Sequence, residues 1–381
     1  MLSKKLTIIL ALAFPLAGYG IGQLRSVRAP KIGDGRPAVL ASLNGPNGIA
    51  VDAEGNLFIA DTLHYRVRRV DARTGIIKTV AGGGTVETNG DGGPATRARL
   101  EYPTDVAVDA RGHLYIADFS ASRIRRVDAQ TGFITTVAGN GDPGCHSIDP
   151  PITGVIATST CLESPEGIAL DAIGNLFISD RRHRVYRVEA TTGLLTMYAG
   201  GGRGDIGDGG PATQGRLSFP QGLCFDHQGN LLVADYQHCR IRRVDVKKQR
   251  IETAAGSDAD ETPTRAGPAR ETHLRYPSSV VVDAAGNLYF DEGAGGRIWR
   301  IDASTQIVSL FAGGGRRGFG GDGGPALRAR LYNPSGLALD GQGNVYVSDF
   351  VTNRVRRIDA RTGLISTVAG NGHPHRIDVL E

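Results

Sequence analysis

The chain has 381 residues, a length that allows either one large domain or two smaller ones. Its 43 basic and 39 acidic residues leave a formal net charge of +4, so overall charge gives no reason to expect attraction to nucleic acid or another polyanion. Fold and function must therefore come from the internal pattern of the sequence.

The first 20 residues have the pattern of a secretory signal peptide. Lys4 and Lys5 precede an apolar stretch at residues 6–17, and small residues follow at 18–20. A membrane anchor is the less favoured alternative, because the stretch is too short to span a bilayer comfortably and Pro15 interrupts it. We expect an exported protein, periplasmic or secreted, with no membrane span after signal removal.

A proline opens a nearly identical phrase six times along the chain. By subtraction of their positions, these prolines are 57, 62, 55, 57 and 57 residues apart, and they are Pro46, Pro103, Pro165, Pro220, Pro277 and Pro334. A fixed period of this length is typical of repeat architectures.

Each repeat contains four short apolar runs, which in the first repeat are residues 49–51, 57–60, 67–70 and 76–80. Runs rich in Val and Ile and bounded by Asp, Asn and Gly predict four strands in an antiparallel meander. Six such units predict an all-β fold, a single six-bladed β-propeller of four-stranded antiparallel blades over residues 44–371. Residues 21–43 then form an N-terminal arm with a partial linker, and residues 372–381 form a C-terminal tail.

The repeated phrase resembles that of bacterial NHL-repeat propellers and of the NHL region of teneurins. The second repeat reads PTDVAVDARGHLYIADFSASRIRRVDAQTGFITTVAG. The linker sequence GDGGPAT at residues 90–96 recurs at 207–213 and 321–327 and, degraded, at 33–38. The resemblance covers about residues 33–371 and implies the propeller fold. It leaves function open, because one fold hosts many unrelated sites.

Arginine clusters in the third strand of the repeats, as at Arg66, Arg68 and Arg69. In five repeats an aspartate ends the preceding strand, and these residues are Asp61, Asp118, Asp180, Asp235 and Asp349. Guanidinium groups bind carboxylates and carbonyls in a fork geometry, so we expect these aspartates to have a structural role. A basic ring for acidic glycans or nucleic acid is the less favoured alternative, and we expect no nucleic-acid partner.

Two of the four cysteines bracket an insertion at residues 142–160 that no other repeat contains. In an exported protein a disulfide between Cys145 and Cys161 would close this loop and stabilise it. Cys224 occupies a position where other repeats have a small residue, so we expect a buried free thiol. Cys239 lies in a turn, and an intervening strand argues against a bond between Cys224 and Cys239.

Polar side chains follow the repeat proline, at the point where first strands of a propeller meet at the mouth of the axial channel. The candidates for binding a polar ligand are Asn47, Asp105, Glu166 and Gln221. A solvated mouth lined by short polar residues is the alternative. We expect no dedicated metal site and no cofactor, with a divalent cation at the mouth as the alternative.

The fifth repeat departs most from the pattern, because Asp291 and Glu292 stand where the first repeat has Ala and Asp. Its preceding linker, residues 257–269, lacks GDGG. In an antiparallel meander the linkers and the turns between second and third strands lie on one face, called here the linker face. Variable loops on a rigid scaffold tend to bind ligands, so we expect binding on this face and include Asp291 and Glu292 as candidates.

Two functions fit these observations. The favoured one is a binding scaffold, a monomer outside the cytoplasm that presents its linker face to a protein, peptide or glycan. The alternative is a metal-dependent lactonase or lyase, since enzymes of related six-bladed propellers hold a cation at the channel with Glu, Asn and Asp. No catalytic residue is assigned, because the chain contains no catalytic signature such as G-x-S-x-G or H-E-x-x-H.

Overall fold

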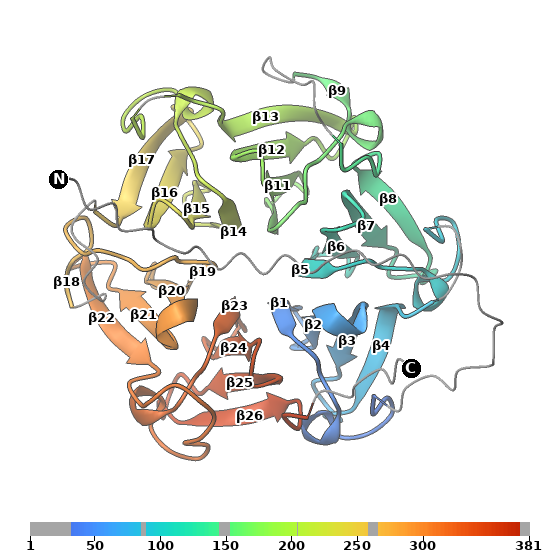
Figure 1. Ribbon diagram of the computed structural model, residues 1–381, viewed down its shortest axis with the longest axis vertical. Helices are drawn as coiled ribbons and strands as arrows, with labels where there is room; N and C mark the ends of the chain where they lie inside the picture. Colours follow the sequence, from blue (N-terminus) through green and yellow to red (C-terminus); the bar gives the residue numbers. More distant parts are fainter. Residues whose placement is uncertain (1–31, 85–88, 145–152, 204, 258–265, 374–381) are drawn as a thin grey trace, which may run out of the picture. The chain divides into compact units, whose positions relative to one another are not determined.

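The computed structural model describes residues 32–84, 89–144, 153–203, 205–257 and 266–373. Within these ranges the chain forms six antiparallel sheets arranged around one axis (Figure 1), which confirms the predicted six-bladed propeller. Each sheet is one blade built from one repeat in sequence order. No helix in the described ranges is long and apolar enough to cross a membrane.

Each blade contains four consecutive strands, of which the first is innermost and the fourth is outermost. The strands of blades 1 to 3 are β1 (Pro46–Val51), β2 (Leu57–Asp61), β3 (Arg66–Val70), β4 (Ile77–Gly82), β5 (Pro103–Val108), β6 (Leu114–Asp118), β7 (Arg123–Val127), β8 (Ile134–Ala138), β10 (Ile168–Leu170), β11 (Leu176–Asp180), β12 (Arg184–Val188) and β13 (Leu194–Gly200). The strands of blades 4 to 6 are β14 (Pro220–Phe225), β15 (Leu231–Asp235), β16 (Arg240–Asp245), β17 (Arg250–Ala255), β19 (Val280–Val282), β20 (Leu288–Glu292), β21 (Arg297–Ile301), β22 (Ile307–Ala312), β23 (Pro334–Leu339), β24 (Val345–Asp349), β25 (Arg354–Ile358) and β26 (Ile365–Ala369).

Two blades have a fifth strand, which the sequence did not predict. The linker segments β9 (Val155–Ile156) and β18 (Gly267–Pro268) pair with the outermost strands β13 and β22. In the other four blades a linker proline forms a single bridge to the outer strand at the same place, and these pairs are Pro37–Ile76, Pro94–Phe133, Pro211–Arg250 and Pro325–Leu364. The linkers thus cover the start of each outer edge, which would otherwise offer unpaired backbone groups to another chain.

Short 3-10 helices occur at two kinds of place. Five lie in the linkers, and they are η1 (Ala38–Leu40), η3 (Ala95–Arg97), η4 (Ala157–Ser159), η5 (Ala212–Gln214) and η7 (Ala326–Arg328). Four of these follow a proline whose φ is near −60°, as at Pro94, and each buries its first alanine. The other two, η2 (Thr62–His64) and η6 (Gly293–Gly295), follow second strands.

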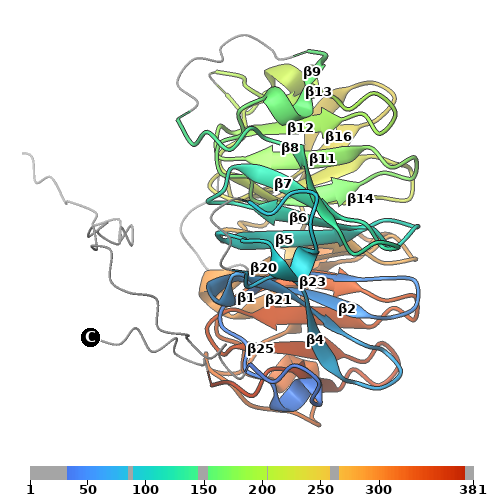
Figure 2. The same cartoon turned by 90° about the vertical axis from the view of Figure 1, so that its right-hand side faces the viewer.

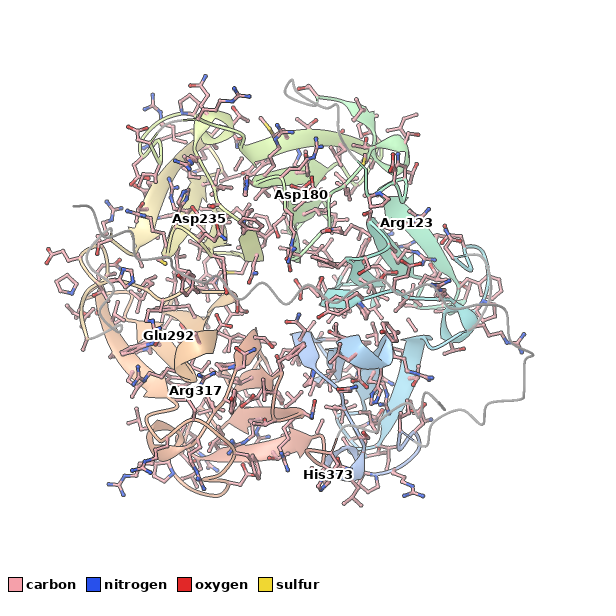
Figure 3. The ribbon with its side chains drawn as sticks, viewed as in Figure 1. Arg123, Asp180, Asp235, Glu292, Arg317 and His373 are labelled. Atoms are coloured by element: carbon pink, nitrogen blue, oxygen red, sulfur yellow. The ribbon has the colours of Figure 1, made fainter. Side chains whose placement is uncertain are left out.

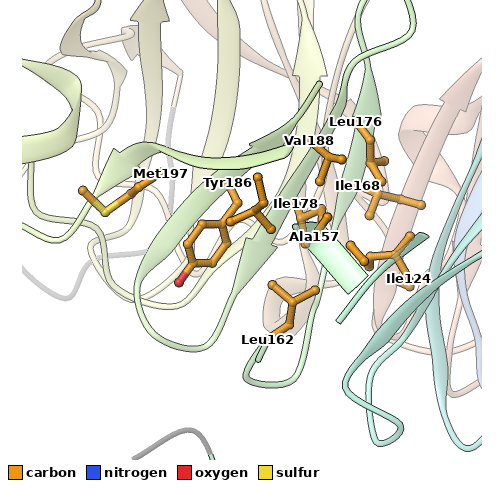
Figure 4. Packing of buried hydrophobic residues seen from close by; sticks show 12 residues of the cluster. Ile124, Ala157, Leu162, Ile168, Leu176, Ile178, Tyr186, Val188 and Met197 are labelled. Carbon is orange, nitrogen blue, oxygen red and sulfur yellow. The ribbon is translucent and has the colours of Figure 1, made fainter. Parts of the chain in front are cut away.

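The hydrophobic core lies between neighbouring blades rather than in a single centre. Figure 4 shows one such layer, in which Ile124 of blade 2 packs beside Leu162 and Ile178 of blade 3. Equivalent clusters join the other neighbouring blades, including the last and the first. Burial of these faces by packing blade on blade is what closes the ring.

The linker that precedes blade 1 also contacts the end of blade 6. The backbone N–H of Gly370 donates to the carbonyl of Ala38 at 3.0 Å, and the N–H of Gly45 donates to Oδ1 of Asn353 at 2.8 Å. The degraded linker at residues 33–38 therefore acts as the other linkers do, and it joins the two ends of the ring.

A buried arginine in the third strand anchors the linker in four blades. These arginines are fully or almost fully buried, and each donates to the aspartate of the GDG sequence, in the pairs Arg68–Asp34, Arg125–Asp91, Arg242–Asp208 and Arg356–Asp322. Asp91 of the recurring linker sequence thus pairs with a buried arginine of its own blade. Blades 3 and 5 have Tyr186 and Trp299 in place of the arginine, and their linkers lack GDGG.

Strand direction defines the two faces of the ring. Seen from the side in Figure 2, the strands run across the thickness of the disc. Linkers and second-to-third-strand turns lie at one face, and the two remaining turns of each blade lie at the other, called here the hairpin face. Each first strand contacts the first strands of both neighbouring blades, so the residues after each repeat proline lie close to the axis on the linker face.

Candidate functional site

The strand-end aspartates (Asp61, Asp118, Asp180, Asp235 and Asp349) are buried beneath the linker face, with at most 1% exposure. Their carboxylates accept hydrogen bonds from the backbone where the linker enters the first strand, as from the N–H of Ser218 to Asp235 at 2.7 Å. Figure 3 shows Asp180, Asp235 and Glu292, which end the second strands of three neighbouring blades. These contacts position the start of each first strand, where the predicted axial cluster of Asn47, Asp105, Glu166 and Gln221 is located.

Asp105 joins three blades. In blade 2 its Oδ1 accepts from the N–H of Val106, and its Oδ2 accepts from the N–H of Ile168 in blade 3, both at 2.9 Å. On its other side it packs against Gly48 of blade 1. Ser279 bridges blades 5 and 6 in the same way, because its Oγ accepts from the N–H of Leu337 at 3.1 Å. Two residues after the repeat proline, the other blades have Gly or Ser. The aspartate at this position of blade 2 makes a contact between blades.

Glu166 lies two residues before the neighbouring first strand β10 and pairs with an arginine. Its Oε1 accepts from Nε of Arg181 at 3.0 Å, and its side chain is 14% exposed. Burial raises the pKa of Glu166, against the lowering effect of the Arg181 charge. Burial also raises the pKa of Asp105 to about 7, and the nearby Glu166 charge adds to that rise although two backbone hydrogen bonds oppose it. Asp105 and Glu166 therefore form an electrostatically linked pair.

Asn47 and Gln221 are partly exposed at the corresponding positions of blades 1 and 4. The carbonyl of Gln221 accepts from Oγ of Ser179 at 2.6 Å, and the carbonyl of Asn47 packs against Gly336. The structure thus brings Asp105 and Glu166 together, while Asn47 and Gln221 contribute backbone contacts between blades. Among the described residues, no three His, Cys, Asp or Glu side chains are grouped as they would be around a metal ion.

Aromatic side chains surround the Arg181–Glu166 pair on the linker face. The guanidinium carbon of Arg181 lies 4.6 Å from the ring centre of Phe119 and 5.9 Å from that of Phe219. Further aromatic residues occur at the same strand ends of blades 2, 4 and 5, and the set is called here the aromatic arc: Tyr102, Phe119, Phe219, Tyr236 and Tyr276. All five are partly exposed or exposed, and two neighbouring pairs have ring centres 5.7 Å and 5.2 Å apart, Tyr102–Phe119 and Tyr236–Tyr276.

Arg181 and the aromatic arc were not predicted from the sequence. Their signal lies in two columns of the repeat, the residue before the proline and the residue after the strand-end aspartate. The first column reads Gly45, Tyr102, Ser164, Phe219, Tyr276 and Asn333, and the second reads Thr62, Phe119, Arg181, Tyr236, Gly293 and Phe350. The apolar columns of the strands stay apolar in every repeat, whereas these two columns mix aromatic, small and charged residues at one face.

Asp291 and Glu292 of the fifth blade are both fully buried. Asp291 accepts from the backbone N–H groups of Ser278 and Ser279, at 2.7 and 2.8 Å, and burial raises its pKa to about 6. Oε2 of Glu292 accepts from Nε1 of Trp299 at 2.9 Å, and burial raises the pKa of Glu292 as well. Both oxygens of Asp291 and Oε2 of Glu292 accept from protein donors, and Oε1 of Glu292 is buried without a hydrogen-bond partner among the described residues. Neither side chain is exposed on the linker face, so the proposed binding site does not include them.

Two of the four cysteines bear on the predicted disulfide. Cys161 is buried at the end of the blade 3 linker. Cys145 lies outside the described residues, so its bond to Cys161 stays a prediction. Cys224 and Cys239 are free thiols, and burial raises the pKa of both.

Because several carboxyl groups are buried, we expect the free energy of unfolding to fall as the pH rises. Burial raises the pKa of Asp105 and Asp180 to about 7 and that of Asp118 and Asp291 to about 6. In the unfolded chain an aspartate has a pKa of about 3.9, so between these values the folded protein binds more protons. The free energy of unfolding should therefore be higher at pH 5 than at pH 8.

Urea denaturation of the wild type and of Asp105→Asn at both pH values tests this expectation. One pKa unit corresponds to about 1.4 kcal/mol, so removal of the Asp105 carboxyl should reduce the pH 5 to pH 8 difference by about 2 kcal/mol. The comparison cancels the contribution of His183, whose pKa burial lowers and which acts in the opposite direction. An unchanged difference in Asp105→Asn would contradict the buried state of this carboxyl.

Comparison with known proteins shows the family to which the chain belongs. The profile of the Teneurin NHL domain family matches residues 16–88, 84–154 and 312–377, together more than half of the chain. With six NHL-type blades in one ring, the chain belongs to the NHL-repeat β-propeller family, as its repeats indicated.

Among curated proteins, the chain is similar to Protein SUPPRESSOR OF QUENCHING 1, chloroplastic, of Arabidopsis thaliana and to Teneurin-1 of Mus musculus. The first is 25% identical over 342 residues, which is 87% of this chain and 32% of that protein. The second is 28% identical over 312 residues, which is 74% of this chain and 11% of that protein. The chain thus spans less than a third of the length of these two relatives.

Solved structures show the same fold at low identity. A Bacteroides thetaiotaomicron protein of unknown function has a TM-score of 0.62 and 18% identity, with 84% of this chain and 70% of that chain covered. A streptogramin B lyase has a TM-score of 0.51 and 16% identity, with 88% and 85% covered. At these identities the likeness concerns the fold alone.

Proposed function

We propose that the chain is an exported binding module that holds a protein or peptide on its linker face, around the Arg181–Glu166 pair. The aromatic arc is the observation that carries this proposal. Aromatic side chains are enriched at protein interfaces, and tyrosine is enriched among the residues that dominate their binding energy. Here partly exposed aromatic rings occur in neighbouring columns on the linker face of a rigid scaffold.

The alternative, a metal-dependent lactonase or lyase, would use the oxygens of Asn47, Asp105 and Glu166. Both oxygens of Asp105 accept backbone hydrogen bonds, and Oε1 of Glu166 accepts from Arg181. These contacts favour the binding module. A stoichiometric divalent ion in the purified protein, with a hydrolytic activity lost on chelation, would favour the enzyme.

A matched pair of phenylalanines in blade 2 tests the binding face. Phe119 belongs to the aromatic arc, whereas Phe133, 46% exposed, lies immediately before the fourth strand β8, next to a turn of the hairpin face. A partner captured from a cell-envelope extract should be identified by mass spectrometry, purified and titrated against wild type, Phe119→Ala and Phe133→Ala. Loss of a ring at a binding hot spot typically costs about 2 kcal/mol or more, so Phe119→Ala should weaken binding at least about tenfold.

Phe133→Ala should bind within about twofold of the wild type, since isolated exposed residues outside an interface contribute little. The proposal is overturned if Phe133→Ala loses the partner and Phe119→Ala keeps it. Melting temperatures of both variants show that each is folded.

A further inference from the structure

Arg181 is the only charged residue in its column of the repeat, where the other blades have Thr62, Phe119, Tyr236, Gly293 and Phe350. Its guanidinium stacks on the ring of Phe119, lies near the ring of Phe219, and donates from Nε to Glu166. Two ring faces and one carboxylate are the groups that bind an organic cation in proteins. The three partners come from three different first- or second-strand ends, so the ring of blades holds them in place.

The surroundings of this place favour a positive charge. Glu166 lies two residues before the first strand of blade 3, and its carboxylate already pairs with the guanidinium of Arg181. The aromatic faces add the negative side of their quadrupoles. The carboxylate and the ring faces would repel an anion at this point, whereas a cation would be stabilised.

The interaction of Arg181 with Glu166 and the two rings is weak. Its side chain is 46% exposed, in contrast to the arginines that anchor the linkers, such as Arg125, whose side chain has no exposure. Ion pairs with this much solvent contact contribute little to stability. An incoming cation can therefore replace Arg181, and the displaced guanidinium returns to water at little cost.

We propose that the cradle of Phe119, Phe219 and Glu166 is the binding site for an arginine side chain of the partner, and that Arg181 fills it as a tethered substitute in the free protein. A guanidinium is favoured over an ammonium group because it stacks on rings and forms forked hydrogen bonds to carboxylates. This inference rests on the proposed function and names the chemistry that the binding face recognises.

N-acetyl-argininamide is the probe, and N-acetyl-citrullinamide, which is neutral and nearly the same shape, is its control. We expect Arg181→Ala to bind the argininamide about two- to sixfold more tightly than the wild type, because the tethered side chain competes for the site but holds it only as strongly as an exposed ion pair does. Glu166→Gln in the Arg181→Ala background should reverse most of this gain. The citrullinamide should bind neither protein measurably in the same titration.

Arg181→Met, which keeps the packing of the aliphatic stem, should behave as Arg181→Ala does and serves if the alanine variant unfolds. The inference is overturned if the folded Arg181 variants bind the argininamide no better than the wild type, or bind the citrullinamide equally well. If that happens while Phe119→Ala still loses the captured partner, the binding face stands and only the assignment of a cation fails.

Discussion

Replacing Arg242 by alanine should lower the free energy of unfolding by about 3–5 kcal/mol, the range for breaking one side of a buried ion pair. Arg242 has no exposure, and its guanidinium donates to Oδ1 of Asp208 at 2.6 Å and to the carbonyls of Ile206 and Arg216. The strand-end aspartate Asp235, also fully buried, lies 3.5 Å from it. The substitution would remove one donor from Asp208 and from the carbonyls of Ile206 and Arg216, and it would leave the buried Asp235 without the neighbouring guanidinium. It would thereby detach the linker from blade 4.

Arg243 is the matched control, because it is the next residue of the same strand and points to the surface. Its side chain is 37% exposed and pairs with Asp226 at 3.2 Å. Exposed pairs contribute about 0–1 kcal/mol, so Arg243→Ala should be nearly neutral. Urea denaturation of both variants measures the difference. Equal effects would show that the linker anchor does not depend on Arg242.

The fold was predictable from the sequence because the same pattern of four strand-like runs occurs in all six repeats. Each strand run is short, but a period of about 57 residues repeated six times leaves few architectures to consider. The added strands β9 and β18 were not predicted, since a two-residue pairing by a linker has no pattern of alternation. The arginine anchors were also readable in part: the Asp and the Arg are always 34 residues apart, and both are absent from blades 3 and 5.

The site was less predictable, for a physical reason. The predicted site residues were oxygen-bearing side chains near the axis. A carboxylate at such a position can bind either a ligand or the backbone N–H of a neighbouring blade, and the sequence does not distinguish the two. Asp105 does the second, toward Ile168, and only the packing of blade 2 on blade 3 determines that choice. Arg181 and Phe119 come from different repeats, so their contact is a property of the ring and not of any one repeat.

Replacing Gly48 by alanine should be the other strongly destabilising change, and it acts at the contact between blades 1 and 2. A Cβ at Gly48 would lie 2.1 Å from Oδ1 of Asp105, 2.6 Å from its Cα and 2.8 Å from the carbonyl oxygen of Thr104. Two of these three atoms belong to the backbone, which cannot move away as a flexible side chain could. The first strands of the two blades would have to separate, and overpacking of this kind costs about 1–3 kcal/mol or more.

Gly341→Ala is the control, because a Cβ there meets no atom within 4 Å and the residue has no left-handed φ. It should change the free energy of unfolding by no more than about 0.5 kcal/mol, as surface substitutions usually do. The variant Gly48→Ala with Asp105→Gly removes the carboxylate but keeps both backbone contacts, so it should recover little stability. Full recovery in that double variant would mean that the carboxylate alone sets the spacing of the blades, and that the inner strands can adjust where this structure has them fixed.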